Sequence, residues 1–157
     1  MMKDVVAGAH GMSGETWKRH ANPWSVWTRF AAIPFFELAI WSREWIGWWS
    51  LAGLAVVLAW LFWFNVRIFG PVGPDSWAAR GIYGEQLHVE GKLPGEHQVV
   101  LRLLIVAGLV GFVLIAWGLI ALQIWPLVLG TVLLVLAQLW RIDRYGLLYG
   151  RRENEGS

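Results

Sequence analysis

Long apolar stretches, separated by short polar segments, make up most of this chain of 157 residues. The clearest of them runs from Trp45 to Phe64, which is 20 residues without a charged side chain. A helix that crosses a bilayer needs about 20 predominantly apolar residues. The pattern predicts an all-α integral membrane protein with four transmembrane helices, at about residues 26–42, 45–64, 99–122 and 124–140.

The first of these helices is expected to be irregular. Its apolar part, Phe30–Trp41, has only 12 residues and includes Pro34 and Glu37. Adding the preceding residues back to Trp24 restores a spanning length, with the long side chain of Arg29 reaching to the headgroups. A re-entrant or interfacial helix is the alternative for this segment.

The last two helices are expected to form a hairpin. One continuous helix from Val99 to Trp140 would be much longer than the bilayer is thick. We therefore place a turn at Gln123–Trp125, followed by Pro126 in the first turn of the next helix, where the missing N–H does no harm. Small residues on the third helix favour close packing against the fourth, with homo-oligomerisation as the alternative: Ala107, Gly108, Gly111 and Gly118.

The polar segments divide the rest of the chain. Residues 1–16 are expected to be a mobile tail, residues 17–142 the membrane domain, and residues 143–157 a polar tail. Between them, the 34-residue loop 65–98 is expected to form a short cap. A short helix is expected from Ser13 or Thr16 to His20, broken by Asn22-Pro23. In the loop, Asp75 or Ser76 is expected to cap a helix over Trp77–Arg80 that Gly81 stops, and residues 84–90 are expected to be extended.

Cations set the expected orientation. If both termini and the 65–98 loop are cytoplasmic, Arg43 is the one Lys or Arg on the other side. A positive excess marks the cytoplasmic face, which predicts a multi-pass protein of a prokaryotic cytoplasmic (inner) membrane with both termini inside. The 57% hydrophobic and 15% charged residues and the 13 tryptophans agree with a membrane location. The twelve cations on the cytoplasmic side would be Lys3, Lys18, Arg19, Arg29, Arg67, Arg80, Lys92, Arg102, Arg141, Arg144, Arg151 and Arg152.

Histidines and acids near the cytoplasmic face are candidates for a metal site. Imidazole and carboxylate suit iron, zinc or copper, and a folded loop could bring His20, Glu85, His88 and His97 together. No pair among them has the spacing of a dedicated ligand motif, so interfacial histidines bonded to backbone or headgroups are the simpler interpretation. The chain has no cysteine, which excludes disulfides, thiol catalysis and thiolate-bound metals.

Other charged residues suggest roles at or inside the membrane. Glu37 is an acid within an expected span, and four alternatives are open for it: protonation, pairing with Arg29 or Arg43, a role in a proton or substrate path, or a position that simply reaches the outer interface. Four cations are candidates for binding anionic headgroups, namely Lys18, Arg19, Arg141 and Arg144. Interleaved acids and the absence of a soluble domain argue against nucleic acid.

The segment Trp17-x-x-His20-Ala-Asn-Pro-Trp-Ser-Val-Trp-Thr-Arg29, with Ser42-Arg43, Asn65-x-Arg67-x-Phe69 and Gly84-Glu85, resembles an uncharacterised prokaryotic family of small polytopic membrane proteins. The resemblance covers residues 17–97, implies a membrane protein and assigns no role to any residue.

Without a specific catalytic signature, an accessory, structural or lipid-binding membrane subunit is the expected function, with lipids, other membrane subunits or a second copy as partners. A membrane enzyme or cofactor protein that uses the histidine and carboxylate set is the alternative. An oligomeric transporter that uses Glu37 ranks third.

Overall fold

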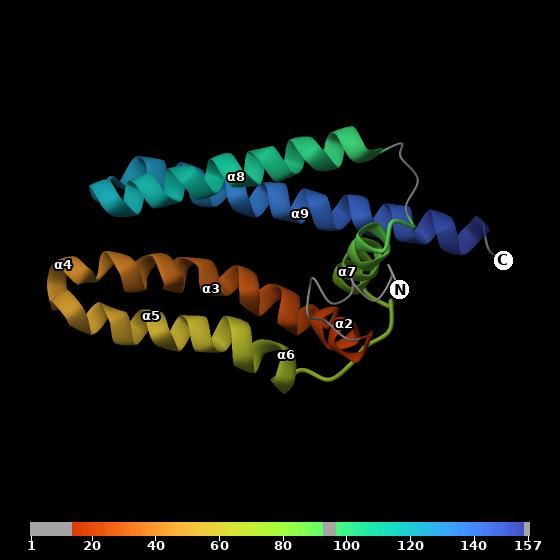
Figure 1. Cartoon of the computed structure of the whole chain (residues 1–157), viewed down its shortest axis with the longest axis horizontal. Coiled ribbons are helices and arrows are strands. Elements are labelled where there is room, and N and C mark those ends of the chain that lie inside the picture. Colours follow the sequence, from red (N-terminus) through yellow and green to blue (C-terminus); the bar gives the residue numbers. More distant parts are fainter. Residues whose placement is uncertain (1–13, 93–96, 156–157) are drawn as a thin grey trace.

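The computed structural model describes residues 14–92 and 97–155, and these residues form helices and no strand. Two helical hairpins lie next to each other, and a short helix runs across one end of them (Figure 1). In chain order the elements are α2 (Gly14–His20), α3 (Pro23–Trp41), α4 (Arg43–Ile46), η1 (Gly47–Trp49), α5 (Ser50–Ala59), η2 (Trp60–Phe64), α6 (Asn65–Ile68), α7 (Trp77–Val89), α8 (Gln98–Ala121) and α9 (Ile124–Glu155).

Three helical segments are long and apolar enough to cross a membrane, judged by length and composition: Pro23–Phe64, Gln98–Ala121 and Ile124–Asn154. The first of them is folded back on itself, because α3 and α5 run side by side as the two arms of a hairpin (Figure 1). The all-α class and its apolar helices are therefore as expected. The expected mobile tail at residues 1–13 lies outside the described residues, whereas residues 14–16 belong to α2.

The first hairpin turns at a glycine. Gly47 has φ +54° and ψ −130°, a conformation that glycine adopts readily and other residues do not. The expected unbroken helix from Trp45 to Phe64 is therefore wrong, since the regular helix begins at Ser50 and ends in the π-helical turn η2. At the other end of α3, the break at Asn22-Pro23 is confirmed, and Asn22 Oδ1 accepts a hydrogen bond from Trp24 N (3.0 Å).

The second hairpin packs backbone against backbone. A Cβ on Gly111 would lie 2.8 Å from Gly130 O, and a Cβ on Gly118 would lie 2.6 Å from Leu127 N. The expected small-residue contact between the last two helices is confirmed within one chain, since Gly108 also faces α9. The turn falls at Leu122, whose φ of 54° is left-handed.

Helix α9 continues far past the expected end of the fourth span. With 32 residues it is about 48 Å long, whereas the hydrocarbon core of a bilayer is about 30 Å thick. The expected polar tail from residue 143 is therefore wrong. Ile142, Tyr145 and Leu148 are buried at helical spacing, because the C-terminal part of α9 packs against α7 and the start of α8.

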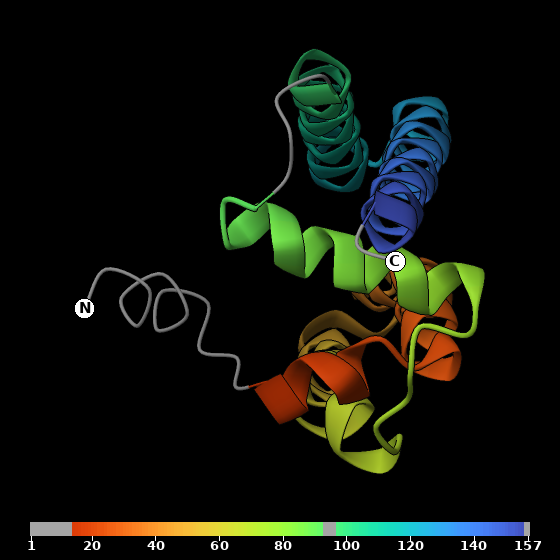
Figure 2. The same cartoon turned by 90° about the vertical axis from the view of Figure 1, so that its right-hand side faces the viewer.

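The loop between the hairpins also contains more helix than expected. Ser76 caps α7 as predicted, with its Oγ accepting from Ala79 N (3.1 Å). Gly81 does not stop the helix, and the segment expected to be extended is helical to Val89. The reason is that Gly81 and Gly84 are contact residues: a Cβ at either would lie 2.7 Å or less from the α9 backbone. Figure 2 shows α7 crossing α9 at a steep angle.

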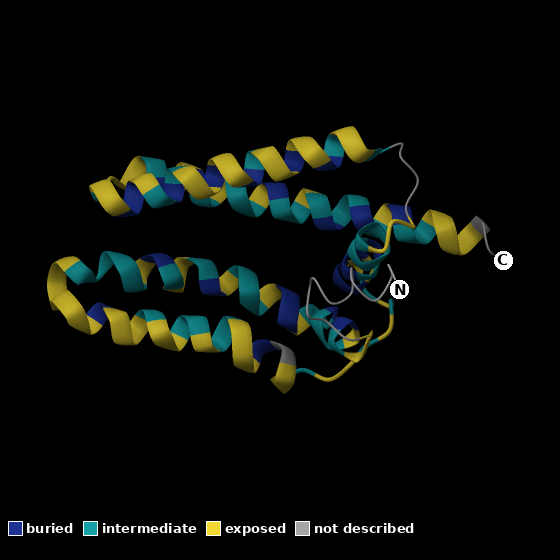
Figure 3. Ribbon diagram, viewed as in Figure 1, coloured by how far each residue is buried: buried dark blue, intermediate teal, exposed yellow. Residues whose placement is uncertain are grey.

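The best-buried apolar cluster lies at the junction of α2, α3, α7 and α9. We call this end of the molecule the cap, comprising residues 14–22, 70–92 and 141–155. Along the hairpins, by contrast, much of the helix surface is apolar and exposed (Figure 3), as expected where lipid rather than protein covers it. The cluster residues are Trp17, Ala21, Val26, Ala78, Ala79, Ile82 and Ile142.

Candidate functional site in the cap

One contact between α2 and α3 lies at the centre of the cap's polar interactions. The Arg29 Nη1 group contacts both ring nitrogens of His20, and its Nη2 donates to the His20 carbonyl oxygen (3.2 Å). Arg29 Nε donates to Ser25 O (3.0 Å). The donors of Arg29 are therefore occupied by α2 and by its own helix, while its expected contact with headgroups stays a prediction. Burial, and secondly the Arg29 charge, lower the pKa of His20 to about 3.

This contact predicts a dependence of stability on pH. His20 is neutral in the folded protein at pH 5, whereas in the unfolded chain, where its pKa is about 6.5, it is largely protonated. Its contribution to stability is therefore complete above pH 6.5 and decreases as pH falls toward 3. At pH 5 we expect a loss of about 2 kcal/mol relative to pH 7.5.

The measurement is the midpoint of SDS-induced unfolding in mixed micelles at pH 7.5 and pH 5. The His20→Gln variant should lose most of this pH dependence, since its amide oxygen still accepts from Arg29 and it does not titrate. His97→Gln is the matched control and should keep the dependence. An unchanged slope in His20→Gln would contradict the assignment.

The predicted metal ligands lie near the cap, but the structure does not gather them into a metal centre. Glu85 forms an ion pair with Arg141, at 3.3 Å between Oε1 and Nη2, and the His88 ring packs on the Tyr145 ring with 5.4 Å between centroids. His97 precedes α8 as its N-cap residue. Within residues 14–92 and 97–155, no group of three His, Asp or Glu side chains could hold a metal ion. His20, Glu85 and His88 each contact a helix next to their own instead.

A buried hydrogen-bond network, which the sequence did not reveal, joins the two ends of the first hairpin. Asn65 is fully buried, its Oδ1 accepts from Ser25 Oγ (2.5 Å), and its Nδ2 donates to Thr28 Oγ1 (2.7 Å). Thr28 Oγ1 also lies 2.6 Å from Trp24 O. Asn65 was expected to begin a loop. Asn65 directly follows the uninterrupted apolar run 45–64, and this position could have indicated the network. If the helix continues past the run, the buried amide side chain needs hydrogen-bond partners.

Replacing Asn65 by alanine should destabilise the protein by about 2–4 kcal/mol, because the buried Ser25 hydroxyl then loses its acceptor and two hydrogen bonds disappear. The SDS unfolding midpoint measures this loss. Gln123→Ala, at an exposed turn position, is the control and should change stability by less than about 0.5 kcal/mol. Equal effects of the two substitutions would contradict the buried network.

At the opposite end from the cap, two polar contacts join the hairpins. Glu37 Oε1 lies 2.6 Å from Thr131 Oγ1 on α9, and Arg43 Nη2 donates to the carbonyl oxygens of Leu119 (2.5 Å) and Ile120 (3.2 Å). The expected pairing of Glu37 with Arg29 or Arg43 is therefore wrong, since each of the three faces a different element. Arg43 instead places its charge at the C-terminal end of α8, where the helix dipole favours a cation.

The four cations expected to bind headgroups differ in their surroundings. Arg141 is committed to Glu85, while Lys18 is exposed and Arg19 Nη1 lies 3.5 Å from Arg67 O. The Arg144 guanidinium lies over the Trp140 ring, 6.0 Å from its centroid. Arg67, which was not singled out from the sequence, lies over Trp63 at 4.7 Å. Cations beside tryptophans at helix ends are typical of the membrane–water interface.

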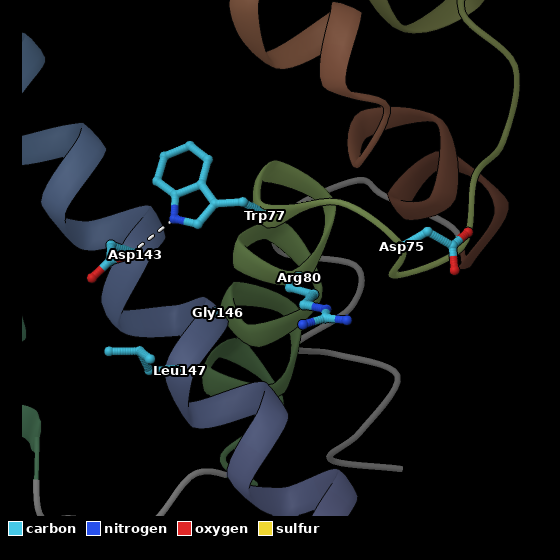
Figure 4. Close-up of a pocket in the computed structure, with 6 residues that line it drawn as sticks. All are labelled: Asp75, Trp77, Arg80, Asp143, Gly146 and Leu147. Atoms are coloured by element: carbon cyan, nitrogen blue, oxygen red, sulfur yellow. Dashed lines mark hydrogen bonds between the residues drawn. The ribbon is translucent and has the colours of Figure 1, made fainter.

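A hollow of about 230 Å³ lies where the beginning of α7 meets α9 (Figure 4). Trp77 Nε1 donates to Asp143 Oδ1 across the helix junction (3.0 Å). Arg80 Nε donates to Pro74 O (3.0 Å), and among the described residues Arg80 forms no ion pair with either nearby acid. Sequence reasoning missed this site because Asp143 was assigned to a tail. The lining residues are Asp75, Trp77, Arg80, Asp143, Gly146 and Leu147.

Comparison with known proteins assigns nearly the whole chain to one family. The model of a family of unknown function, DUF6653, matches residues 1–155. The chain belongs to the DUF6653 family. The family match extends well beyond the expected residues 17–97, over both hairpins and the cap. No curated protein and no solved structure matches the chain.

Proposed function

We propose that this DUF6653 chain is a four-span protein of a prokaryotic cytoplasmic membrane that binds anionic lipid through its cap and has no catalytic role. The observation that carries the proposal is the placement of the cations. Among the described residues, Arg43 is the one Lys or Arg at the turn ends of the hairpins, and the others lie at or near the cap end. A positive excess favours the cytoplasmic side for the cap.

The tryptophans support a bilayer between the two ends. Trp17 is buried in the cap, and the remaining twelve divide equally between the two ends of the hairpins. Tryptophan is enriched at both membrane–water interfaces, because its ring is apolar and its N–H needs a polar partner. Six lie toward the turns, at 41, 45, 48, 49, 117 and 125, and six toward the cap, at 24, 27, 60, 63, 77 and 140.

The fold-back of Pro23–Phe64 supports the proposed count of four spans. An even number of crossings places both hairpin turns on one side and the cap on the other, and α3 with 19 residues is about 28 Å long. Helix α9 then extends from the membrane into the cap, where its last turns support α7. The lipid-binding role adds cations of the cap, of which Lys18 is exposed and the half-buried Arg144 lies over the Trp140 ring, each contributing about 1 kcal/mol toward anionic lipid.

Lipid retention in nanodiscs that contain phosphatidylglycerol and phosphatidylcholine tests the role. We expect enrichment of phosphatidylglycerol around the protein that weakens with salt and decreases in the triple variant Lys18→Gln, Arg19→Gln, Arg144→Gln. Arg151→Gln is the control, because Arg151 lies about 16 Å along α9 from Trp140, beyond the screening length of about 8 Å. No enrichment, or equal loss in the control, would contradict the proposed function.

A further inference from the structure

We propose that the hollow between α7 and α9 is a binding site for the headgroup of an aminophospholipid of the phosphatidylethanolamine type. The inference rests on the proposed function, since it takes the cap to lie at the lipid headgroups. It adds a specific pocket and a specific zwitterionic ligand to that general attraction for anionic lipid.

The charges of the hollow match a zwitterion. Asp143 uses Oδ1 to accept from Trp77 and keeps Oδ2 as an acceptor for an ammonium group. Arg80, whose Nε is committed to Pro74 O, keeps its two terminal nitrogens as donors for a phosphate. Arg80 is exposed and forms no ion pair among the described residues, so its terminal nitrogens are open to a ligand, and a charge-assisted hydrogen bond to a phosphate is roughly twice as strong as a neutral one.

The geometry places the two charged groups on different helices around one volume. Asp143 lies on α9 and Arg80 on α7, and Trp77 reaches from the start of α7 to Asp143 (Figure 4). A volume of about 230 Å³ is enough for an ethanolamine phosphate, but smaller than the usual pocket for a drug-sized ligand. The indole of Trp77 also offers its ring to the ammonium group.

A path for the acyl chains leads from the hollow to the membrane helices. Trp77 stacks on Trp27 of α3, with 6.1 Å between centroids and 21° between ring planes. Both rings are partly exposed, 41% and 49% respectively, and Trp27 lies in the second turn of α3. Leu147 on the α9 side is also exposed. A headgroup in the hollow would therefore have its glycerol and chains on an apolar, aromatic surface.

A primary ammonium fits better than a quaternary one. Asp143 and Asp75 accept hydrogen bonds, and an ammonium group has three N–H donors whereas a choline has none. Phosphatidylglycerol offers a phosphate to Arg80 but brings no cation for Asp143. The expected order of affinity is therefore phosphatidylethanolamine first, with phosphatidylcholine and phosphatidylglycerol about tenfold or more weaker, the effect of one charge-assisted hydrogen bond.

Native mass spectrometry of the full chain in detergent, titrated with the three lipids of identical acyl chains, tests this order. Arg80→Gln and Asp143→Asn should each weaken phosphatidylethanolamine binding about tenfold. Asp143→Asn keeps the oxygen that accepts from Trp77, so its effect reports the charge. Arg151→Gln and Glu44→Gln, at exposed positions away from the hollow, are the matched controls and should bind as the parent protein does.

The outcomes separate the two proposals. If phosphatidylglycerol is retained in a salt-dependent way but phosphatidylethanolamine is not preferred, the proposed function stands and the headgroup site is wrong. A preference that survives both Arg80→Gln and Asp143→Asn also overturns the site. Soluble phosphoethanolamine that binds as tightly as the lipid would show that the hollow recognises a free metabolite rather than a membrane lipid.

Discussion

Replacing Gly84 by alanine should destabilise the protein by about 3 kcal/mol or more. Helix propensity alone would make this substitution favourable by up to about 1 kcal/mol. The added methyl group, however, would lie 2.1 Å from Tyr145 O and 2.6 Å from Tyr145 C, so α7 must move away from α9. The Tyr145 backbone is part of α9 and cannot move aside as a flexible side chain could, so the two helices must separate. Their separation exposes Ile82 and Ile142, which are buried where the helices cross.

Gly150→Ala is the matched control for this substitution. Gly150 is also in a helix, yet no atom lies within 4 Å of the position that its Cβ would occupy. The same chemical change should therefore leave the SDS unfolding midpoint unchanged or raise it slightly. If Gly84→Ala and Gly150→Ala shift the midpoint in the same direction, α7 does not cross α9 as described.

The second large effect is expected inside the α8–α9 hairpin. A Cβ on Gly130 would lie 2.6 Å from Gly111 O and 2.7 Å from Ile115 N. Gly130→Ala should therefore cost about 2–3 kcal/mol, measured by the same unfolding midpoint, because the helix axes must separate along a contact made of backbone atoms.

Gly53→Ala on α5 is the control, since its nearest neighbour, Ala39 Cβ, would lie at an ordinary 3.7 Å. The difference between the two variants isolates close packing from helix propensity. Equal stability of Gly130→Ala and Gly53→Ala would mean that α8 and α9 do not approach through their glycines.

The apolar pattern located the long apolar helices and placed the ends of α3 and α8 within three residues, but it missed the turn at Gly47 and the full length of α9. Hydropathy is a property of each segment alone, and it correctly selected the stretches that became α3, α5, α8 and the first part of α9. The helical end of α9 was missed because its charged residues suggested a tail. Ile142, Tyr145 and Leu148 recur every three residues, and this period was the signal that α9 continues into the cap.

Glycines caused the opposite error in α7. From sequence, Gly81 is a helix stop, because glycine weakens helices and often ends them. In the folded chain Gly81 and Gly84 let α7 approach α9, through contacts with Ile142 and Tyr145 that lie 61 positions later in the sequence. The pairs Glu85–Arg141 and Trp77–Asp143 are 56 and 66 residues apart, so the candidate site could not be assembled from spacing alone.

The central claim is that both hairpins cross the membrane, with the cap on the cytoplasmic side, and single-cysteine labelling tests it most directly. The chain has no cysteine, so each introduced thiol is unique. At exposed positions, Glu44→Cys and Gln123→Cys should react with an impermeant thiol reagent in intact cells, whereas Lys92→Cys and Arg151→Cys should react only after lysis. Labelling of Lys92→Cys and Arg151→Cys from opposite sides, or protection of Glu44→Cys together with the cap positions, would contradict the four-span arrangement.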